Sequence, residues 1–63
     1  MERRDMIKVI KNASFSGYYE IYDDAQPIEE VQGRLKAKRM ALKIARKLKQ
    51  PFIIFLGESV DVE

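Results

Sequence analysis

The residues with the clearest capacity for chemistry are the cations between positions 34 and 49. This segment holds eight of the twelve Lys and Arg residues of the 63-residue chain and no Asp or Glu. The rest of the chain holds four basic and ten acidic residues, so the formal net charge of +2 conceals a segment of +8 beside a remainder of −6. A cluster of this kind attracts polyanions, above all the phosphates of nucleic acids, without choosing among sequences.

The spacing of these cations predicts that they lie on one side of an amphipathic helix. At 100° per residue, an apolar arc collects Ala37, Met40, Ala41, Ile44, Ala45 and Leu48, with Leu35 and Leu42 beside it. The opposite arc, which we call the cationic stripe, consists of Lys36, Arg39, Lys43, Arg46 and Lys47. Like charges three or four residues apart repel by about 0.2–0.5 kcal/mol per pair. Selection for helix stability alone would therefore have placed Glu among them.

Three interpretations of the cationic stripe stay open at this point. It binds nucleic acid phosphates, it binds an acidic protein surface, or it is an ordinary solvated face. The apolar arc holds three Ala residues and no aromatic residue. It therefore offers little to insert into a membrane, and we expect it to pack on a sheet, with no membrane partner.

The run Lys38-Arg39-Met40-Ala41-Leu42-Lys43-Ile44-Ala45 resembles the basic, Ala-rich final helix of double-stranded-RNA-binding domains. That family places three strands before this helix and ends with it. Here the sequence predicts two strands before the helix and an apolar strand after it. The resemblance covers eight residues, and none of the family's RNA-binding residues is transferred to this chain.

The remaining reactive groups do not form a recognisable catalytic or metal site. The chain has no His and no Cys, so the usual general base, the thiol nucleophile, the disulfide and the thiolate zinc site are excluded. The acidic pairs Asp23-Asp24 and Glu29-Glu30 fit no calcium-loop spacing, and three isolated Gly residues form no phosphate-binding loop. We expect no enzyme, no metal and no cofactor.

The elements that position these residues follow from the apolar pattern. Strands are expected over Met6 to Lys11 and Tyr18 to Tyr22, joined by a turn at 12–17. A helix is expected through most of 27–49, beginning either near Pro27 or at Arg34, since Pro27, Glu29 and Glu30 suit a helix start. Phe52 to Leu56 indicates a buried strand. A turn at Gly57-Glu58 and the alternation of Val60 and Val62 suggest a short edge strand or a frayed tail.

The sequence therefore predicts a single small α+β domain spanning 1–63, in the order β-β-α-β with a possible fourth short strand. Its sheet is expected to be largely antiparallel, three- to four-stranded, and covered on one face by one amphipathic helix. The uncovered face, which we call the open sheet face, should carry Tyr18 and Tyr22. It should also carry either Phe52, Ile54 and Leu56 or Ile53 and Phe55.

An uncovered face with Tyr and apolar side chains is suited to binding a protein partner or a second copy, or to stacking nucleic acid bases. The predicted function is a small non-enzymatic interaction domain that uses the open sheet face and the cationic stripe. The alternative is a nucleic-acid-binding module that contacts phosphates through the stripe. No run of 18 apolar residues exists and the N-terminus lacks an apolar signal region, so we expect a cytoplasmic protein.

Overall fold

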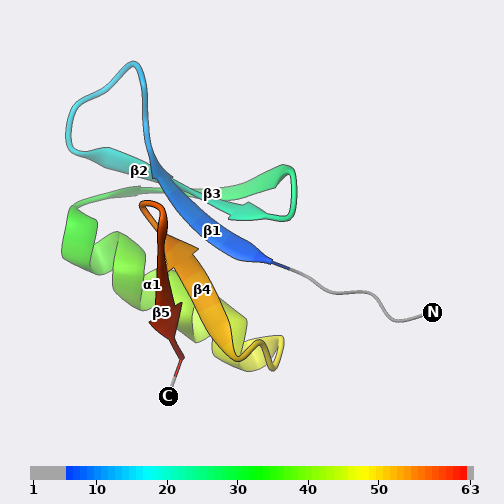
Figure 1. Ribbon diagram of the computed structural model, residues 1–63. Coiled ribbons are helices and arrows are strands. Elements are labelled where there is room, and N and C mark those ends of the chain that lie inside the picture. Colours follow the sequence, from blue (N-terminus) through cyan, green and yellow to red (C-terminus); the bar gives the residue numbers. More distant parts are fainter. Residues whose placement is uncertain (1–5, 63) are drawn as a thin grey trace.

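The computed structural model describes residues 6–62, which form five strands and one helix (Figure 1). Residues 1–5 and Glu63, the last residue of the alternating tail, lie outside the described part. The elements are β1 (Ile7–Lys11), β2 (Tyr18–Asp23), β3 (Gln26–Gln32), α1 (Arg34–Lys47), β4 (Phe52–Phe55) and β5 (Glu58–Asp61).

The five strands form one mixed sheet in the order β3-β2-β1-β4-β5. β1 pairs antiparallel with β2, β2 with β3, and β4 with β5, whereas the central pair of β1 and β4 is parallel. α1 connects β3 to β4 and packs on one side of the sheet, against β1, β2, β3 and β4 (Figure 1). This is the α+β architecture expected from the sequence, although the sheet has more strands than the three or four predicted.

The largest error of the sequence prediction concerns residues 27–33, which do not belong to the helix. Residues Gln26–Gln32 form β3, so that three strands precede α1 and two follow it. The chain reverses at Asp24-Ala25, where Asp24 adopts a positive φ of 59° and Asp23 pairs with Gln26. Asp tolerates this conformation better than most residues. Pairing with β2 therefore overrides the local helix-start signals, and Pro27 is accommodated because β3 is an edge strand.

Gly33 ends β3 and fixes the start of the helix at Arg34, which was the second of the two predicted starting points. Its φ of 101° lies in a region that L side chains rarely adopt. The Gly33 amide donates to the carbonyl of Gly17 at 2.8 Å, and the Gly33 carbonyl accepts from the Ala37 amide at 3.0 Å. The strand-to-helix corner is thus tied to the loop that joins β1 to β2.

The helix ends two residues earlier than predicted, at Lys47, through a Schellman motif. The amide of Gln50 donates to the carbonyl of Ala45 at 2.8 Å, and that of Lys49 donates to Arg46 at 3.1 Å. Lys49 occupies the left-handed position, with φ of 59°, that Gly usually takes. Pro51 then leads into β4 and disfavours helical geometry at Gln50.

The last two strands form a tight hairpin, which confirms the additional short strand. The two-residue turn is Leu56-Gly57 rather than Gly57-Glu58, because Phe55 pairs with Glu58. Both turn residues have positive φ, 52° for Leu56 and 89° for Gly57, as a type I′ turn requires. Beyond the strand, the Val62 amide donates to the Pro51 carbonyl at 3.0 Å and so closes the end of the hairpin.

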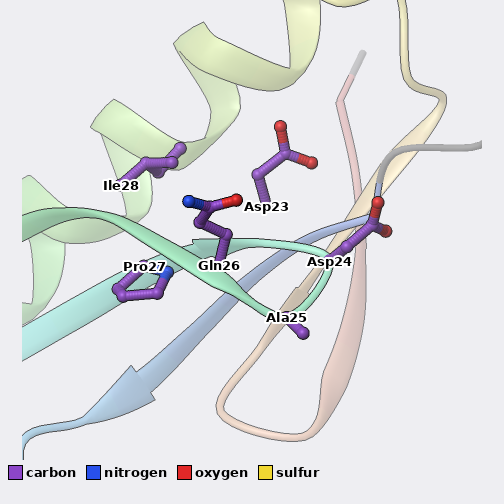
Figure 2. A pocket seen from close by; sticks show the side chains of 6 residues that line it. All are labelled: Asp23, Asp24, Ala25, Gln26, Pro27 and Ile28. Atoms are coloured by element: carbon purple, nitrogen blue, oxygen red, sulfur yellow. The ribbon is translucent and has the colours of Figure 1, made fainter.

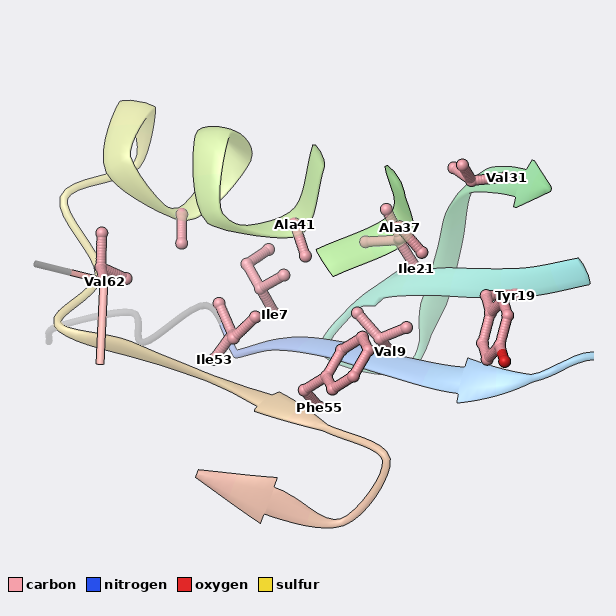
Figure 3. Packing of buried hydrophobic residues seen from close by; sticks show 11 residues of the cluster. Ile7, Val9, Tyr19, Ile21, Val31, Ala37, Ala41, Ile53, Phe55 and Val62 are labelled. Carbon is pink, nitrogen blue, oxygen red and sulfur yellow. The ribbon is translucent and has the colours of Figure 1, made fainter. Parts of the chain in front are cut away.

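The core lies between α1 and the covered face of the sheet (Figure 3). The helix contributes only Ala37, Ala41 and Ala45 as fully buried residues. The sheet contributes larger side chains: Ile7, Val9, Tyr19, Ile21, Val31, Ile53 and Phe55. Small residues on the helix let its backbone approach the sheet closely, which explains why Ala rather than Leu occupies the centre of the apolar arc. The prediction that Leu48 lies on that arc is wrong. Its side chain is 40% exposed, because the helix has already ended at Lys47.

Cationic stripe and open sheet face as the candidate site

The structure brings all five residues of the cationic stripe to the outer side of α1. Lys36, Arg39, Lys43, Arg46 and Lys47 are each exposed, whereas the alanines four residues apart face the sheet. Eleven residue steps separate the ends of the stripe, which corresponds to about 16 Å along the helix axis. The helix is therefore an elongated positive surface with flexible ammonium and guanidinium groups pointing into solvent.

Two further helix cations lie apart from the stripe and are already engaged with an aromatic ring. The guanidinium carbon of Arg34 lies 5.6 Å from the centroid of the Phe55 ring, and the ammonium nitrogen of Lys38 lies 5.9 Å from it. Both distances are within the range of cation–π attraction. These cations shield Phe55, which is only 6% exposed, and line a hollow of about 350 Å³ beside β5. No local sequence pattern indicates this contact, because it links the first helical turns to a distant strand.

Within residues 6–62, the stripe makes one hydrogen bond to the rest of the fold. Arg46 donates through Nη2 to the carbonyl of Val62 at 3.4 Å, which is a weak contact with the chain beyond β5. Within residues 6–62 no carboxylate forms an ion pair with a cation of the stripe. The positive charge of α1 is therefore not neutralised inside the described part of the molecule, and the repulsion along the helix remains uncompensated.

The open sheet face is formed by the strand residues that alternate with the buried ones. Cross-strand pairing places Lys8 between Tyr22 and Ile54, and Ile10 opposite Glu20. Tyr18 and Tyr22 lie on this face, as predicted, and β4 turns Ile54 outward while Ile53 is buried. Within residues 6–62 no element packs on this face. Its residues are Lys8, Ile10, Tyr18, Glu20, Tyr22, Glu30, Gln32, Phe52, Ile54, Ser59 and Asp61.

A hydrogen-bonded cluster on the open sheet face was not expected from the sequence. Glu20 on β2 lies directly opposite Glu30 on β3, an arrangement of like charges that destabilises a sheet. The side-chain amide of Asn12 donates to both carboxylates, at 3.0 Å to Glu20 and 2.9 Å to Glu30. The hydroxyl of Tyr22 donates to Glu20 at 3.3 Å. Asn12 thereby joins three segments that are separated in the sequence.

The acidic pairs identified in the sequence do not come together as a metal site. A wide hollow of about 590 Å³ surrounds the turn between β2 and β3 and is lined by Asp23, Asp24, Ala25, Gln26, Pro27 and Ile28. Figure 2 shows that the side chains of Asp23 and Asp24 point in different directions around this turn. Among the described residues, no group of three or more His, Cys, Asp or Glu side chains is placed to hold a metal ion.

Neither membrane insertion nor a known relative supplies a further clue to function. No helix in residues 6–62 has the length and apolar character needed to cross a bilayer. Comparisons with models of known families, with curated proteins and with solved structures give no match for this chain. The function must therefore be argued from the two surfaces alone.

Proposed function

We propose that this protein is a small non-enzymatic binding domain whose cationic stripe binds nucleic acid through the phosphate backbone. The observation that carries the proposal is the set of five exposed cations on α1, none of which has a carboxylate partner within residues 6–62. A surface with uncompensated internal repulsion gains most from an external polyanion. Its cations displace the counterions condensed on the phosphates, and the phosphates reduce the repulsion between the cations.

The chemistry of the stripe favours phosphates over bases. It contains only Lys and Arg, which form charge-assisted bonds to phosphate oxygens. No aromatic side chain lies on the helix to stack on bases. Binding should consequently be strong at low salt and indifferent to sequence.

A salt titration of binding to random-sequence duplex and single-stranded DNA and RNA tests the proposal. If all five cations contact phosphates, the slope of log K against log salt should be about −4.5 for duplex DNA and about −3.5 for single strands. Duplex affinity should then fall roughly 500-fold between about 50 and 200 mM salt. Absence of binding at the lowest salt would overturn the proposal.

Two matched variants locate the binding surface. Lys43→Gln, in the middle of the stripe, should weaken binding and reduce the salt slope by about 0.9. Lys8→Gln removes one cation from the opposite side of the molecule and should leave the slope unchanged. Equal effects of the two variants would show that net charge, rather than the stripe, attracts the polyanion.

Polyglutamate serves as the probe for the competing partner class, an acidic protein surface. It offers carboxylates on a flexible chain in place of regularly spaced phosphates. If the stripe recognises phosphates, polyglutamate of equal charge should compete poorly with nucleic acid. If it competes equally well, the partner is an acidic protein and the nucleic acid proposal fails.

A further inference from the structure

The open sheet face is a second surface, and its chemistry does not depend on phosphate binding by the stripe. Across the three inner strands, Lys8 lies in the middle of this face and is surrounded by Ile10 on β1, Tyr22 on β2, and Phe52 and Ile54 on β4. Ile10 is 37% exposed, whereas Ile7 and Val9 on the same strand are fully buried under α1. Alternate residues of one strand thus meet a helix on one side and solvent on the other.

We propose that a second copy of this chain binds the open sheet face, giving a two-fold symmetric dimer in which the two sheets pack face to face. A two-fold interface is formed by the same patch on both copies, so the patch must be complementary to itself. Sheets that pack in this way lie about 10 Å apart, with their inner side chains interdigitated.

Charge disfavours a symmetric contact through the other surfaces, because the charged side chains of each are of one sign. Pairing of two α1 helices would oppose the cationic stripe with itself. Pairing of the β3 edges would oppose Glu29 and Glu30 with their own copies, and pairing of the β5 edges would do the same with Glu58 and Asp61. Like charges placed directly opposite one another across strands are destabilising.

The open sheet face differs from these surfaces, because Lys8 gives it a positive charge beside its carboxylates. Its cross-strand neighbours are Tyr22 and Ile54, and within residues 6–62 it has no ion-pair partner. The same face carries Glu20 two residue pairs further along β1 and β2, opposite Ile10. In a face-to-face dimer, Lys8 of each copy can pair with a carboxylate of the other copy. The apolar side chains around Lys8 then pack together. One face therefore supplies both signs of charge and the apolar area.

The size of the molecule is suited to this contact. A stable interface of standard size buries about 800 Å² on each partner. That area is about one sixth of the 4869 Å² of accessible surface of this chain. Small domains without disulfides or metals often gain stability by association, because a single small core buries little apolar surface.

Sedimentation velocity across concentrations from about 1 µM to 1 mM tests the inference, since standard-size interfaces have dissociation constants of about 1 µM or below and the dimer should be populated in this range. We expect a species of twice 7.4 kDa that grows with concentration and then stops growing. Its formation should persist at about 1 M salt, where surface charge attraction is screened. A protein that stays monomeric throughout this range overturns the inference.

Substitutions distinguish the sheet face from the helix face. Ile54→Glu should weaken dimerisation at least tenfold, and Ile10→Glu, at a site already 37% exposed, should do the same with less risk to folding. Lys43→Glu on the outer side of α1 is the control and should leave the dimer intact. Circular dichroism checks that each variant is folded.

Two results contradict the face-to-face arrangement even if the protein associates. The first is an association that Lys43→Glu abolishes and that folded Ile10→Glu leaves unchanged. The second is open-ended growth that disappears at high salt, which indicates head-to-tail contact between the stripe and an acidic edge. Because nucleic acid binding is measured separately through the stripe, either proposal can fail while the other survives.

Discussion

The two faces of the sheet are made by the same strands but have different compositions. On the covered face, Ile7, Val9, Ile21 and Ile53 have no exposed surface, and no polar or charged residue among those described is buried as a whole. On the open sheet face, apolar side chains alternate with Lys8, Glu20 and Asp61. The covered face forms the apolar core that stabilises the fold. The open sheet face carries polar and charged side chains, which would be unfavourable in a buried core.

The pleat of the strands places core packing on one face of the sheet and the contact proposed above on the other. A residue and its immediate neighbour along β4, such as Ile53 and Ile54, point to opposite sides. Similar side chains one position apart should therefore respond differently to the same substitution. Four changes test how complete this separation is.

The largest effect is expected from truncation in the core. Ile53→Ala should destabilise the domain by about 2–5 kcal/mol, because it removes a fully buried side chain and leaves a cavity. A domain of this size has about 3–5 kcal/mol of stability in total, so the variant should be close to unfolded at room temperature. Ile54→Ala on the open sheet face is the matched control and should cost about 1 kcal/mol or less. Urea unfolding measures both, and equal losses would refute the separation of the faces.

Overpacking of the helix interface is expected to have the next largest effect. Ala41→Leu adds a large side chain where the helix backbone lies close to the sheet, and should cost about 1–3 kcal/mol. Arg39→Leu introduces the same side chain on the exposed side of α1 and should change stability by about 0.5 kcal/mol or less. Thermal unfolding compares the two variants. If Ala41→Leu is neutral, the close helix-to-sheet contact is not a constraint.

On the open sheet face, the carboxylate cluster offers a smaller and more specific test. Asn12→Ala removes both amide hydrogen bonds to Glu20 and Glu30, and also the acceptor for the amides of Ser14 and Phe15. We expect a loss of about 1–2 kcal/mol. Adding Glu30→Gln should recover part of this loss, since it removes the repulsion that Asn12 offsets. A double-mutant cycle by urea unfolding measures the coupling, and strictly additive effects would show that Asn12 acts only on the turn.

The smallest effect is expected on the outer side of α1. Lys43→Glu places a carboxylate between Arg39 and Lys47, each four residues away, and should stabilise the domain by about 0.5–1 kcal/mol in low salt. Lys43→Gln should give about half of that gain. Both gains should shrink as salt rises. Destabilisation of a folded protein by either change would mean that Lys43 does not face solvent.

The sequence predicted the elements that carry their own pattern and missed the one that does not. The helix core and β4 were recognisable from periodicity and from an unbroken apolar run. β3 was not, because Val31 is its only buried residue. An edge strand that is solvated along most of its length has no period of two to detect, and Pro27 with two Glu residues imitates a helix start.

Side-chain placement on the helix and sheet was predictable to the extent that it depends on local geometry. The exposure of the cationic stripe follows from the helical period, and the strand period places Tyr18 and Tyr22 on the same face of the sheet. The bridge from Asn12 to Glu30 depends on the register of two strand pairs. The choice between Ile53 and Ile54 depends on which side of the sheet the helix covers. Neither can be read from local sequence, because both are set by long-range pairing.

The two-layer construction has one consequence for the way the domain can work in an assembly. The outer side of α1 and the open sheet face lie on opposite sides of the molecule. A partner bound to one surface therefore leaves the other surface sterically accessible. If both proposed surfaces bind, the domain would hold its two partners on opposite sides. Each bound partner would then be held at a raised effective concentration relative to the other, without a change in the shape of the domain.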